Sequence, residues 1–324
     1  MKTSTMTTIT TAALCLAGSL MVSAANAQVV SIATTPAGSY TNSAGTAMAK
    51  VISEKTKLRA TIQAQGQAGL DPVEAGNADF GLGNSFDTTF FATGTAYYSG
   101  NGPKTKVRQV ATMLPYRVGM FVRADSDIKT LADLKGKRLS AGFNTQKTIG
   151  RLIEAELANG GLTYDDVAKV LTPNVRRAAD DFIAGKVDAL FFAVGSAVIK
   201  QAAVTLGGLR LLPLDTAPEA VKRMQDTLPN SYVTVIKPAP GLEGIDVPTP
   251  AIANDMCVFT NKDVSEDTVY QVTKALHDNK AMLVGIFKPF GLFNPDKMAA
   301  VVKDVPFHPG ALKYYKEIGI APKQ

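Results

Sequence analysis

The sequence predicts an α/β protein of two lobes, and three observations support this fold class. Short apolar runs of strand type alternate with amphipathic runs of helix type almost from end to end, as in parallel sheets covered by helices. Residues 32–52 and 138–157 each carry a strand into a helix through a turn of small and hydroxylated residues. Hydrophobic residues make up 46% of the chain and charged residues 19%, which is typical of a globular protein.

Residues 1–27 have the pattern of a secretory signal peptide. Lys2 precedes an apolar run from Ile9 to Val22, and residues 25–27 read Ala-Asn-Ala, an A-x-A cleavage site. An N-terminal membrane anchor is disfavoured, because the apolar run is too short to span a bilayer and contains Thr, Gly and Ser. We expect cleavage after Ala27 and a soluble exported protein of 297 of the 324 residues, enough for two domains.

The first cycle of elements begins with the apolar run at 29–34. The helix after it has one apolar face, made of Ala44, Ala47, Met48, Val51 and Ile52. Residues 59–65 alternate as a strand does, and residues 77–85 predict a further strand that ends in a polar loop. Residues 107–123 read as two strands broken at Pro115.

The second cycle begins with a strand at 138–141, followed by a helix whose apolar face is Ile149, Leu152, Ile153 and Leu157. Strands are then expected at 169–173, 187–194 and 210–214, with helices at 175–184 and around 198–203. Residues 237–250, rich in Pro and Gly, read as a crossover loop that leads into a strand at 251–260. The last helices are expected after the N-cap Ser265 and at the Asn294-Pro295 and His308-Pro309 pairs.

Two similar strand-to-helix turns predict two lobes that face each other across a cleft. We expect lobe I to be discontinuous, residues 28–123 plus 251–324, and lobe II to be residues 124–250, inserted into it. The turns lie at the carboxyl ends of strands, where open α/β sheets bind ligands. Closure over a ligand would be a hinge motion at 117–124 and 246–256.

The catalytic inventory is poor. His277 lies near a helix end and His308 precedes a proline that opens a helix, so capping explains both better than catalysis does. Cys257 remains without a partner cysteine after cleavage and reads as a small buried apolar side chain. No zinc, EF-hand, P-loop, dinucleotide or nucleophile-elbow motif occurs, so we expect no metal, no cofactor and no enzyme. The net charge of +6 is scattered, which disfavours a nucleic-acid partner and suits capture of a small anion.

The turns offer hydrogen-bond donors to a small anionic or zwitterionic solute. The candidates are the backbone at Gly38, Ser39 and Tyr40, the amides of Gln65 and Asn84, the hydroxyls of Ser85, Thr145 and Thr148, the turn at Gly66, and Lys147. Each has a structural alternative, since Ser39, Thr145 and Asn174 are also good helix N-caps and the glycines suit turns.

Arg117 begins an apolar run and would be costly to bury unpaired, so a carboxylate is expected beside it. That carboxylate belongs either to the ligand or to the protein, for example Asp255 or Asp87, and we favour the protein. Arg176 and Arg177 lie in the first turn of a helix, where cations oppose the dipole. They indicate either a nearby anion or, more commonly, a solvated face.

Five segments resemble the TAXI branch of the solute-binding proteins of TRAP transporters: "IATTPAGSYTNSAGTAMAKVI", "EAGNADFGLGNS", "VRADSDIKTLADLKGKRLSAG", "FIAGKVDALFFAVGS" and "VPFHPGALKYYKEIG". The resemblance covers nearly all of the mature chain, and the last segment is the most specific. It implies the type II-like, two-lobed fold of periplasmic binding proteins, with a ligand cleft between the lobes. It also implies a monomeric periplasmic receptor that passes an organic acid or amino acid to the permease subunits of a TRAP transporter, with no bond chemistry.

By position in the family pattern, the resemblance adds Gly195 and Ser196 to the candidate ligand residues. Two turns depart from that pattern: "QAQGQAGLDP" lacks the usual hydroxyls, and "GFNTQKT" replaces bare backbone with polar side chains that include Lys147. The added Lys147 favours a dicarboxylate or an aromatic acid as ligand. Two alternatives remain open, a sensory receptor that reports to a membrane kinase and an exported enzyme that uses a carboxylate or Cys257 in the cleft.

Overall fold

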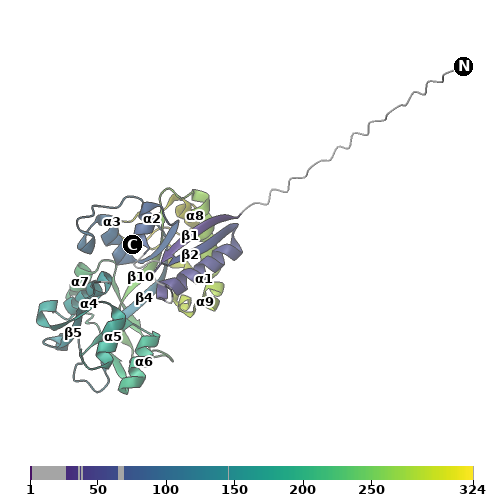
Figure 1. Ribbon diagram of the computed structural model, residues 1–324. Coiled ribbons are helices and arrows are strands. Elements are labelled where there is room, and N and C mark those ends of the chain that lie inside the picture. The colour runs from purple at the N-terminus through teal and green to yellow at the C-terminus, as the bar shows by residue number, and fades with distance from the viewer. Residues whose placement is uncertain (2–26, 36, 38, 65–68, 145, 324) are drawn as a thin grey trace.

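The computed structural model describes residues 27–35, 37, 39–64, 69–144 and 146–323, together with Met1. Its elements gather in two bodies, with the long strands β4 (Val107–Arg123) and β10 (Thr249–Asn261) between them (Figure 1). The first body contains β1 (Gln28–Thr34), α1 (Tyr40–Lys55), β2 (Leu58–Ala64), α2 (Leu70–Ala75), β3 (Phe80–Asn84), α3 (Ser85–Thr93), α8 (Glu266–Asp278), α9 (Lys280–Ile286) and α10 (Pro309–Glu317). The second body contains β5 (Arg138–Gly142), α4 (Lys147–Asn159), β6 (Ala168–Thr172), α5 (Val175–Ile183), β7 (Leu190–Ala193), α6 (Ala197–Leu206), β8 (Leu209–Leu211), α7 (Pro218–Thr227) and β9 (Tyr232–Ile236).

The strands form one eight-stranded sheet and one pair. The large sheet has the order β2-β1-β3-β10-β4-β7, with β8 beside β4 and β9 beside β10, and β5 pairs with β6. Pairs within each cycle are parallel, such as β1 with β2 and β5 with β6, whereas β10 runs antiparallel to β3, β4 and β9. The prediction of parallel sheets therefore holds only in part, because the two strands that serve both bodies run in opposite directions.

The prediction of two strands broken at Pro115 is wrong, because β4 is continuous over 17 residues. Pro115 lies opposite Asp255 in the register, and the Asp255 backbone N–H points away from β4, to Ser85 Oγ at 3.3 Å. The pair is therefore of the non-hydrogen-bonded type, in which the ladder does not need an N–H at Pro115.

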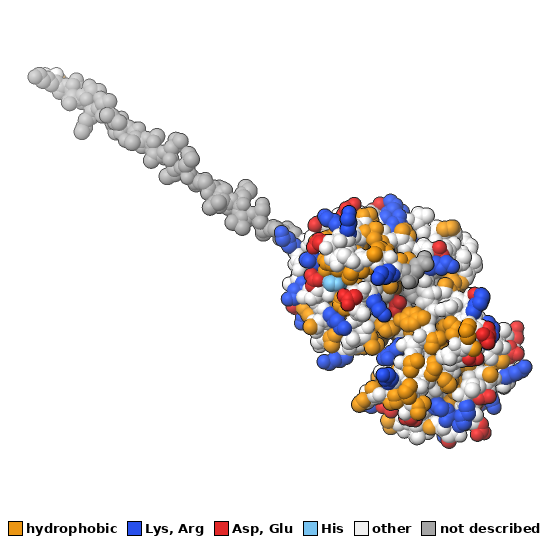
Figure 2. Space-filling view, turned by 180° about the vertical axis from the view of Figure 1, so that it is seen from behind, with side chains coloured by type: hydrophobic (Ala, Val, Ile, Leu, Met, Phe, Trp, Pro, Cys, Tyr) orange, Lys and Arg blue, Asp and Glu red, His pale blue; other side chains and the backbone are white. Residues whose placement is uncertain are grey.

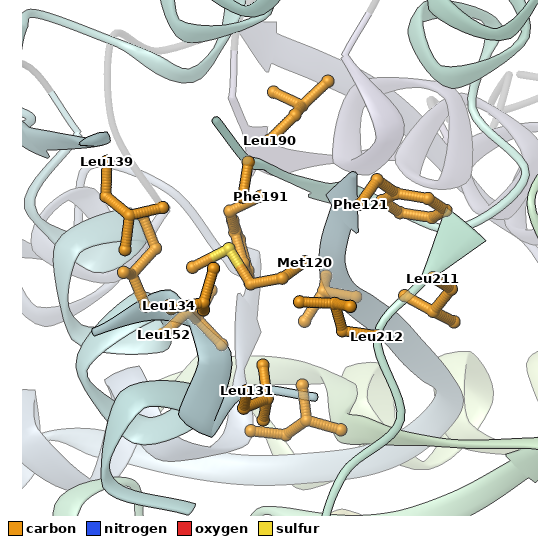
Figure 3. Packing of buried hydrophobic residues seen from close by; sticks show 14 of the residues in the cluster. Met120, Phe121, Leu131, Leu134, Leu139, Leu152, Leu190, Phe191, Leu211 and Leu212 are labelled. Carbon is orange, nitrogen blue, oxygen red and sulfur yellow. The ribbon is translucent and has the colours of Figure 1, made fainter. Parts of the chain in front are cut away.

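Each body has its own hydrophobic core. In the second body, side chains of β4, β5, β7, β8, α4 and the segment at 131–134 pack together, and Figure 3 labels Met120, Phe121, Leu131, Leu134, Leu139, Leu152, Leu190, Phe191, Leu211 and Leu212 among them. In the first body, the apolar face of α1 packs with α8, α10 and one face of β1 and β3. Phe86 and Phe90 of α3 join the second-body core, so α3 contacts both bodies.

Two predicted helix starts are confirmed and one is corrected. Ser265 Oγ accepts a hydrogen bond from the Thr268 N–H at 3.2 Å, and His308 Nδ1 accepts one from the Gly310 N–H at 3.1 Å. The Asn294-Pro295 pair opens only a short 3-10 turn, Pro295–Lys297, and not a helix. Further short 3-10 turns lie at Ala96–Tyr98, Ala132–Leu134, Tyr164–Asp166 and Lys288–Leu292.

Glu156 is a buried carboxyl on the face of α4 that packs on β4. It is 1% exposed, and burial raises its pKa from 4.5 to about 8, although the Met120 backbone N–H acts in the opposite direction. The folded protein therefore keeps this group protonated at neutral pH, whereas the unfolded chain ionises it.

We expect Glu156→Gln to remove a pH dependence of stability. Between pH 4.5 and about 8 the unfolded state binds fewer protons at this site than the folded state, so Glu156 lowers the free energy of unfolding as pH rises. Urea denaturation at pH 5.5 and 8 should show that the free energy of unfolding of the variant, relative to that of the wild type, rises with pH by up to about 1.4 kcal/mol per pH unit. Glu154→Gln, on the same helix in a partly exposed ion pair with Arg151, should leave the slope unchanged. Equal slopes for wild type and Glu156→Gln would contradict the prediction.

Candidate functional site

Four helices begin at turns that the sequence assigns to the ligand: α1, α3, α4 and α6. Ser39 caps α1 by accepting from the Asn42 N–H at 3.2 Å, and Ser196 caps α6 by accepting from the Ile199 N–H at 3.3 Å. The structural alternative for Ser39 is thus confirmed. The first turns of α1, α4 and α6 carry no acidic residue. The free backbone N–H groups and dipoles of these helices therefore remain available to an anion.

Four of the candidate residues lie outside the described residues: Gly38, Gln65, Gly66 and Thr145. The other candidates, Ser39, Tyr40, Asn84, Ser85, Lys147, Thr148, Gly195 and Ser196, are all placed. Their assignment to the ligand stays a prediction, and the contacts below establish which of them the fold brings near one another.

Tyr40 and Arg117 connect the start of α1 with β4. The Tyr40 ring packs on Tyr116, with centroids 5.3 Å apart, and on Phe287 at 5.0 Å. Burial raises the pKa of the Tyr40 hydroxyl above its usual value, and the nearby Arg117 guanidinium acts in the opposite direction. The first residue of α1 therefore lies beside the strand that joins the two bodies.

Arg117 also lies next to the turn that precedes α6. The Val194 N–H donates to the Arg117 carbonyl at 3.0 Å, and the chain then turns through Gly195, whose φ is +75°, into Ser196. A side chain on Gly195 would be strained in this left-handed conformation and would approach Leu242 to 3.0 Å. The turn before α6 and the start of α1, from different bodies, thus contact two neighbouring residues of β4, Arg117 and Tyr116.

The start of α3 is connected to the same place through β10 and β9. Ser85, 3% exposed, accepts from the Asp255 N–H, and the Asp255 carboxylate accepts from the Tyr232 hydroxyl at 2.8 Å. Tyr232 in turn is near enough to Arg117 to affect its pKa. Asn84, the N-cap of α3, makes no capping hydrogen bond with its side chain.

The favoured interpretation of Arg117, an ion pair with a protein carboxylate, is wrong. Both expected carboxylate partners accept hydrogen bonds from tyrosine hydroxyls instead. Tyr232 donates to Asp255, and Tyr97 and Tyr98 donate to Asp87. Within the described ranges, the Arg117 guanidinium has no hydrogen bond and no ion pair.

Asp87, Tyr97 and Thr148 connect the starts of α3 and α4. The Tyr97 hydroxyl donates to Asp87, and the Thr148 hydroxyl is near enough to lower the Tyr97 pKa, while the Tyr98 hydroxyl is 3.4 Å from Asp87. Burial raises the pKa of Asp87 to about 6, although these hydroxyls lower it. We did not predict the two tyrosines from the sequence, and their only signal is an adjacent Tyr-Tyr pair after a glycine.

The basic residues at two helix starts behave differently. Arg176 and Arg177, in the first turn of α5, pair with Asp180 and Asp181 one turn later, so they do not require an external anion. Lys147, the first residue of α4, is exposed and has no ion pair with any residue that the structure describes. A cation at this end of a helix is unfavourable to the dipole unless an anion compensates it.

Cys257 is fully buried, as expected, and burial raises its pKa well above the usual value of a thiol. A thiolate nucleophile at this position is therefore excluded at neutral pH. Among the residues that the structure describes, no group of three His, Cys, Asp or Glu side chains is placed to hold a metal ion. Lysine and arginine side chains are scattered over both bodies on the face shown in Figure 2.

A model of the NMT1-like family matches residues 32–319. The chain belongs to this family. The match spans both bodies and the strands between them, whereas membership of the TAXI branch stays a prediction.

Solved structures of periplasmic binding proteins share the fold. The periplasmic binding protein BugD aligns with a TM-score of 0.56 and 14% identity, over 91% of this chain and 99% of that one. A TctC solute-binding protein from Polaromonas, solved without ligand, gives a TM-score of 0.55 and 14% identity over 91% and 99%. The predicted two-lobed α/β fold is confirmed. In the described part of this NMT1-like protein, no helix combines the length and the apolar character needed to span a bilayer.

We expect Tyr97→Phe to destabilise the protein more than Tyr98→Phe does. The first variant removes a donor from a buried carboxylate and a contact with α4, whereas the second removes only the longer contact at 3.4 Å. The loss for Tyr97→Phe should be about 1–3 kcal/mol of the free energy of unfolding, measured by urea denaturation at pH 7. Equal losses for the two variants would count against Tyr97 as the link between α3 and α4.

Proposed function

We propose that this NMT1-like protein is an extracytoplasmic solute-binding receptor that captures a small organic anion for a TRAP-type secondary transporter. The ligand is a dicarboxylate, an amino acid or a related carboxylate, and the protein does not transform it. The observation that carries the proposal is the set of three linked helix starts, α1, α4 and α6, that lack acidic residues and come from both bodies. Family membership and the shared binding-protein fold support it.

In this proposal the ligand lies between lobe I, residues 28–123 plus 251–324, and lobe II, residues 124–250. The lobes close by a hinge motion in β4 and β10 near 117–124 and 246–256, because no other part of the large sheet serves both bodies. The receptor works as a periplasmic monomer after cleavage behind Ala27, without a metal or cofactor, and its partners are the ligand and the permease subunits.

A ligand that binds the closed form should raise the melting temperature. At a concentration of 100 times its Kd, a single ligand adds about 2.7 kcal/mol to the free energy of unfolding. We expect a thermal-shift screen of dicarboxylates, amino acids and aromatic acids to give at least one stabilising acid whose carboxamide has no effect. The proposal fails if no acid shifts the melting temperature and native mass spectrometry of the protein from its own periplasm detects no bound acid.

Lys147→Ala should weaken the binding of the acid found in that screen. A direct contact between this ammonium and the ligand would be worth about 1.5–3 kcal/mol, which isothermal titration measures as a rise in Kd. Lys135→Ala is the matched control, since Lys135 is also exposed in the second body and lies away from the helix starts. Unchanged affinity in Lys147→Ala would show that Lys147 is only a solvated residue.

A receptor that reports to a membrane kinase would have the same fold and the same ligand. Uptake of the labelled acid separates the two functions, because deletion of this gene abolishes uptake only if the protein feeds a permease. An exported enzyme with Cys257 as its nucleophile is disfavoured, because this thiol is buried and its pKa is raised.

A further inference from the structure

Arg117 is a half-buried cation in the middle of the molecule, and no residue that the structure describes neutralises it. It belongs to β4 at the point where this strand leaves the first body, and its guanidinium makes no hydrogen bond or ion pair with a described residue. Burial lowers its pKa, and the phenols of Tyr40 and Tyr232 only partly oppose this effect. A cation withdrawn from water without a counter-charge is costly in the free protein.

The sheet register fixes the direction of Arg117. Arg117 of β4 lies opposite Ala253 of β10, and Ala253 lies opposite Tyr232 of β9, so the three side chains share one face of the sheet. Ala253, between the two larger residues, is fully buried. The Tyr40 phenol, whose ring packs on the neighbouring Tyr116, is near enough to Arg117 to affect the pKa of the guanidinium.

Other polar groups around this point lack partners as well. The hydroxyls of Tyr40 and Tyr116 make no hydrogen bond to a residue that the structure describes. Asn254 lies opposite Tyr116, on the other face of the sheet from Arg117; it is fully buried and leaves both amide atoms without a partner among the described residues. Buried amides are normally satisfied, so this region has more hydrogen-bonding capacity than the chain itself uses.

We propose that Arg117 anchors the acid group of the ligand, and that this group is a singly charged, planar carboxylate held where β4 and β10 pass from one body to the other. The inference rests on the proposed function and names the chemistry of its ligand. The guanidinium donates two parallel hydrogen bonds to the two carboxylate oxygens, a geometry that a lysine could not reproduce.

The surroundings select a single negative charge. Asp255 lies two residues from Ala253 on the same face of β10, and Tyr232 holds its carboxylate at 2.8 Å. A dianion such as phosphate would bring a second negative charge towards this carboxyl, and like charges repel. The rest of the ligand, including any second acid group, extends towards the start of α4 and Lys147.

Acetate tests the anchor without knowledge of the whole ligand. We expect acetate to shift the backbone amide signals of Tyr40 and Val194 in a saturable titration, with no effect of acetamide and a weaker effect of inorganic phosphate at pH 8. Arg117→Gln should weaken acetate binding roughly tenfold or more, and Arg117→Lys should fall between this variant and the wild type. Arg117→Gln should melt at the same temperature as the wild type or higher, because it removes an unpaired charge.

The outcomes separate this inference from the function on which it rests. If the acid found in the screen binds Arg117→Gln and the wild type equally well, the receptor function stands and the anchor is refuted. If acetate binds through Arg117 but no metabolite is captured, the anchor stands and the receptor function fails. A lower melting temperature for both Arg117→Gln and Arg117→Lys would show a structural role and overturn the inference, as would unsaturable shifts with acetate.

Discussion

The antiparallel pairing of β4 with β10 fixes the position of every group assigned to the site. Because side chains alternate along a strand, a slip of one residue would move Arg117 to the other face of the sheet. Pro115 and Asp255 lie opposite each other where the two strands pass between the bodies. Because their pair is not hydrogen-bonded, the Asp255 N–H is free to reach Ser85 at the start of α3. The register is irregular only on the first-body side of this point, between Met256 and Cys257 and between Val258 and Phe259.

Because tyrosine hydroxyls bind the nearby carboxylates, the positive charge of Arg117 remains available to a ligand. Asp87 is buried and Asp255 is partly buried, and each accepts hydrogen bonds from phenols and makes no ion pair with a described residue. A phenol stabilises a carboxylate by a hydrogen bond without cancelling its charge or consuming an arginine. Arg117 therefore has no ion-pair partner among the described residues and lies near helix starts without acidic residues, so positive charge accumulates where the two bodies meet.

Sequence patterns predicted the architecture well and the site contacts poorly. Local sequence patterns predict the apolar faces of α1 and α4 and the alternation of strands and helices. Local residue types likewise predict the caps at Ser265 and His308. The helix α3 escaped detection because its run Phe-Asp-Thr-Thr-Phe-Phe is buried on all sides and shows no amphipathic period.

The partners of Arg117 and Asp87 could not be inferred from composition alone. Charge matching predicts a carboxylate beside an arginine, but it cannot show that β9 brings Tyr232 to Asp255. Likewise, the contact of Tyr97 with Thr148 joins residues 51 positions apart in different bodies. Such pairings depend on tertiary geometry, which no local pattern encodes.

Contacts on the α3 side stabilise the arrangement of the two bodies that the structure shows. Asn230 donates from Nδ2 to Thr89 Oγ1 at 2.9 Å and accepts from the Lys303 N–H at 3.2 Å, in a left-handed backbone conformation with φ of +60°. Arg151 of α4 lies over the Phe90 ring of α3, 5.7 Å from its centroid. Each contact contributes only about 1 kcal/mol, yet any opening of the lobes that separates α3 from the second body must break them together. The ligand then needs to supply only the difference between open and closed forms, so residues that never touch it take part in setting its affinity.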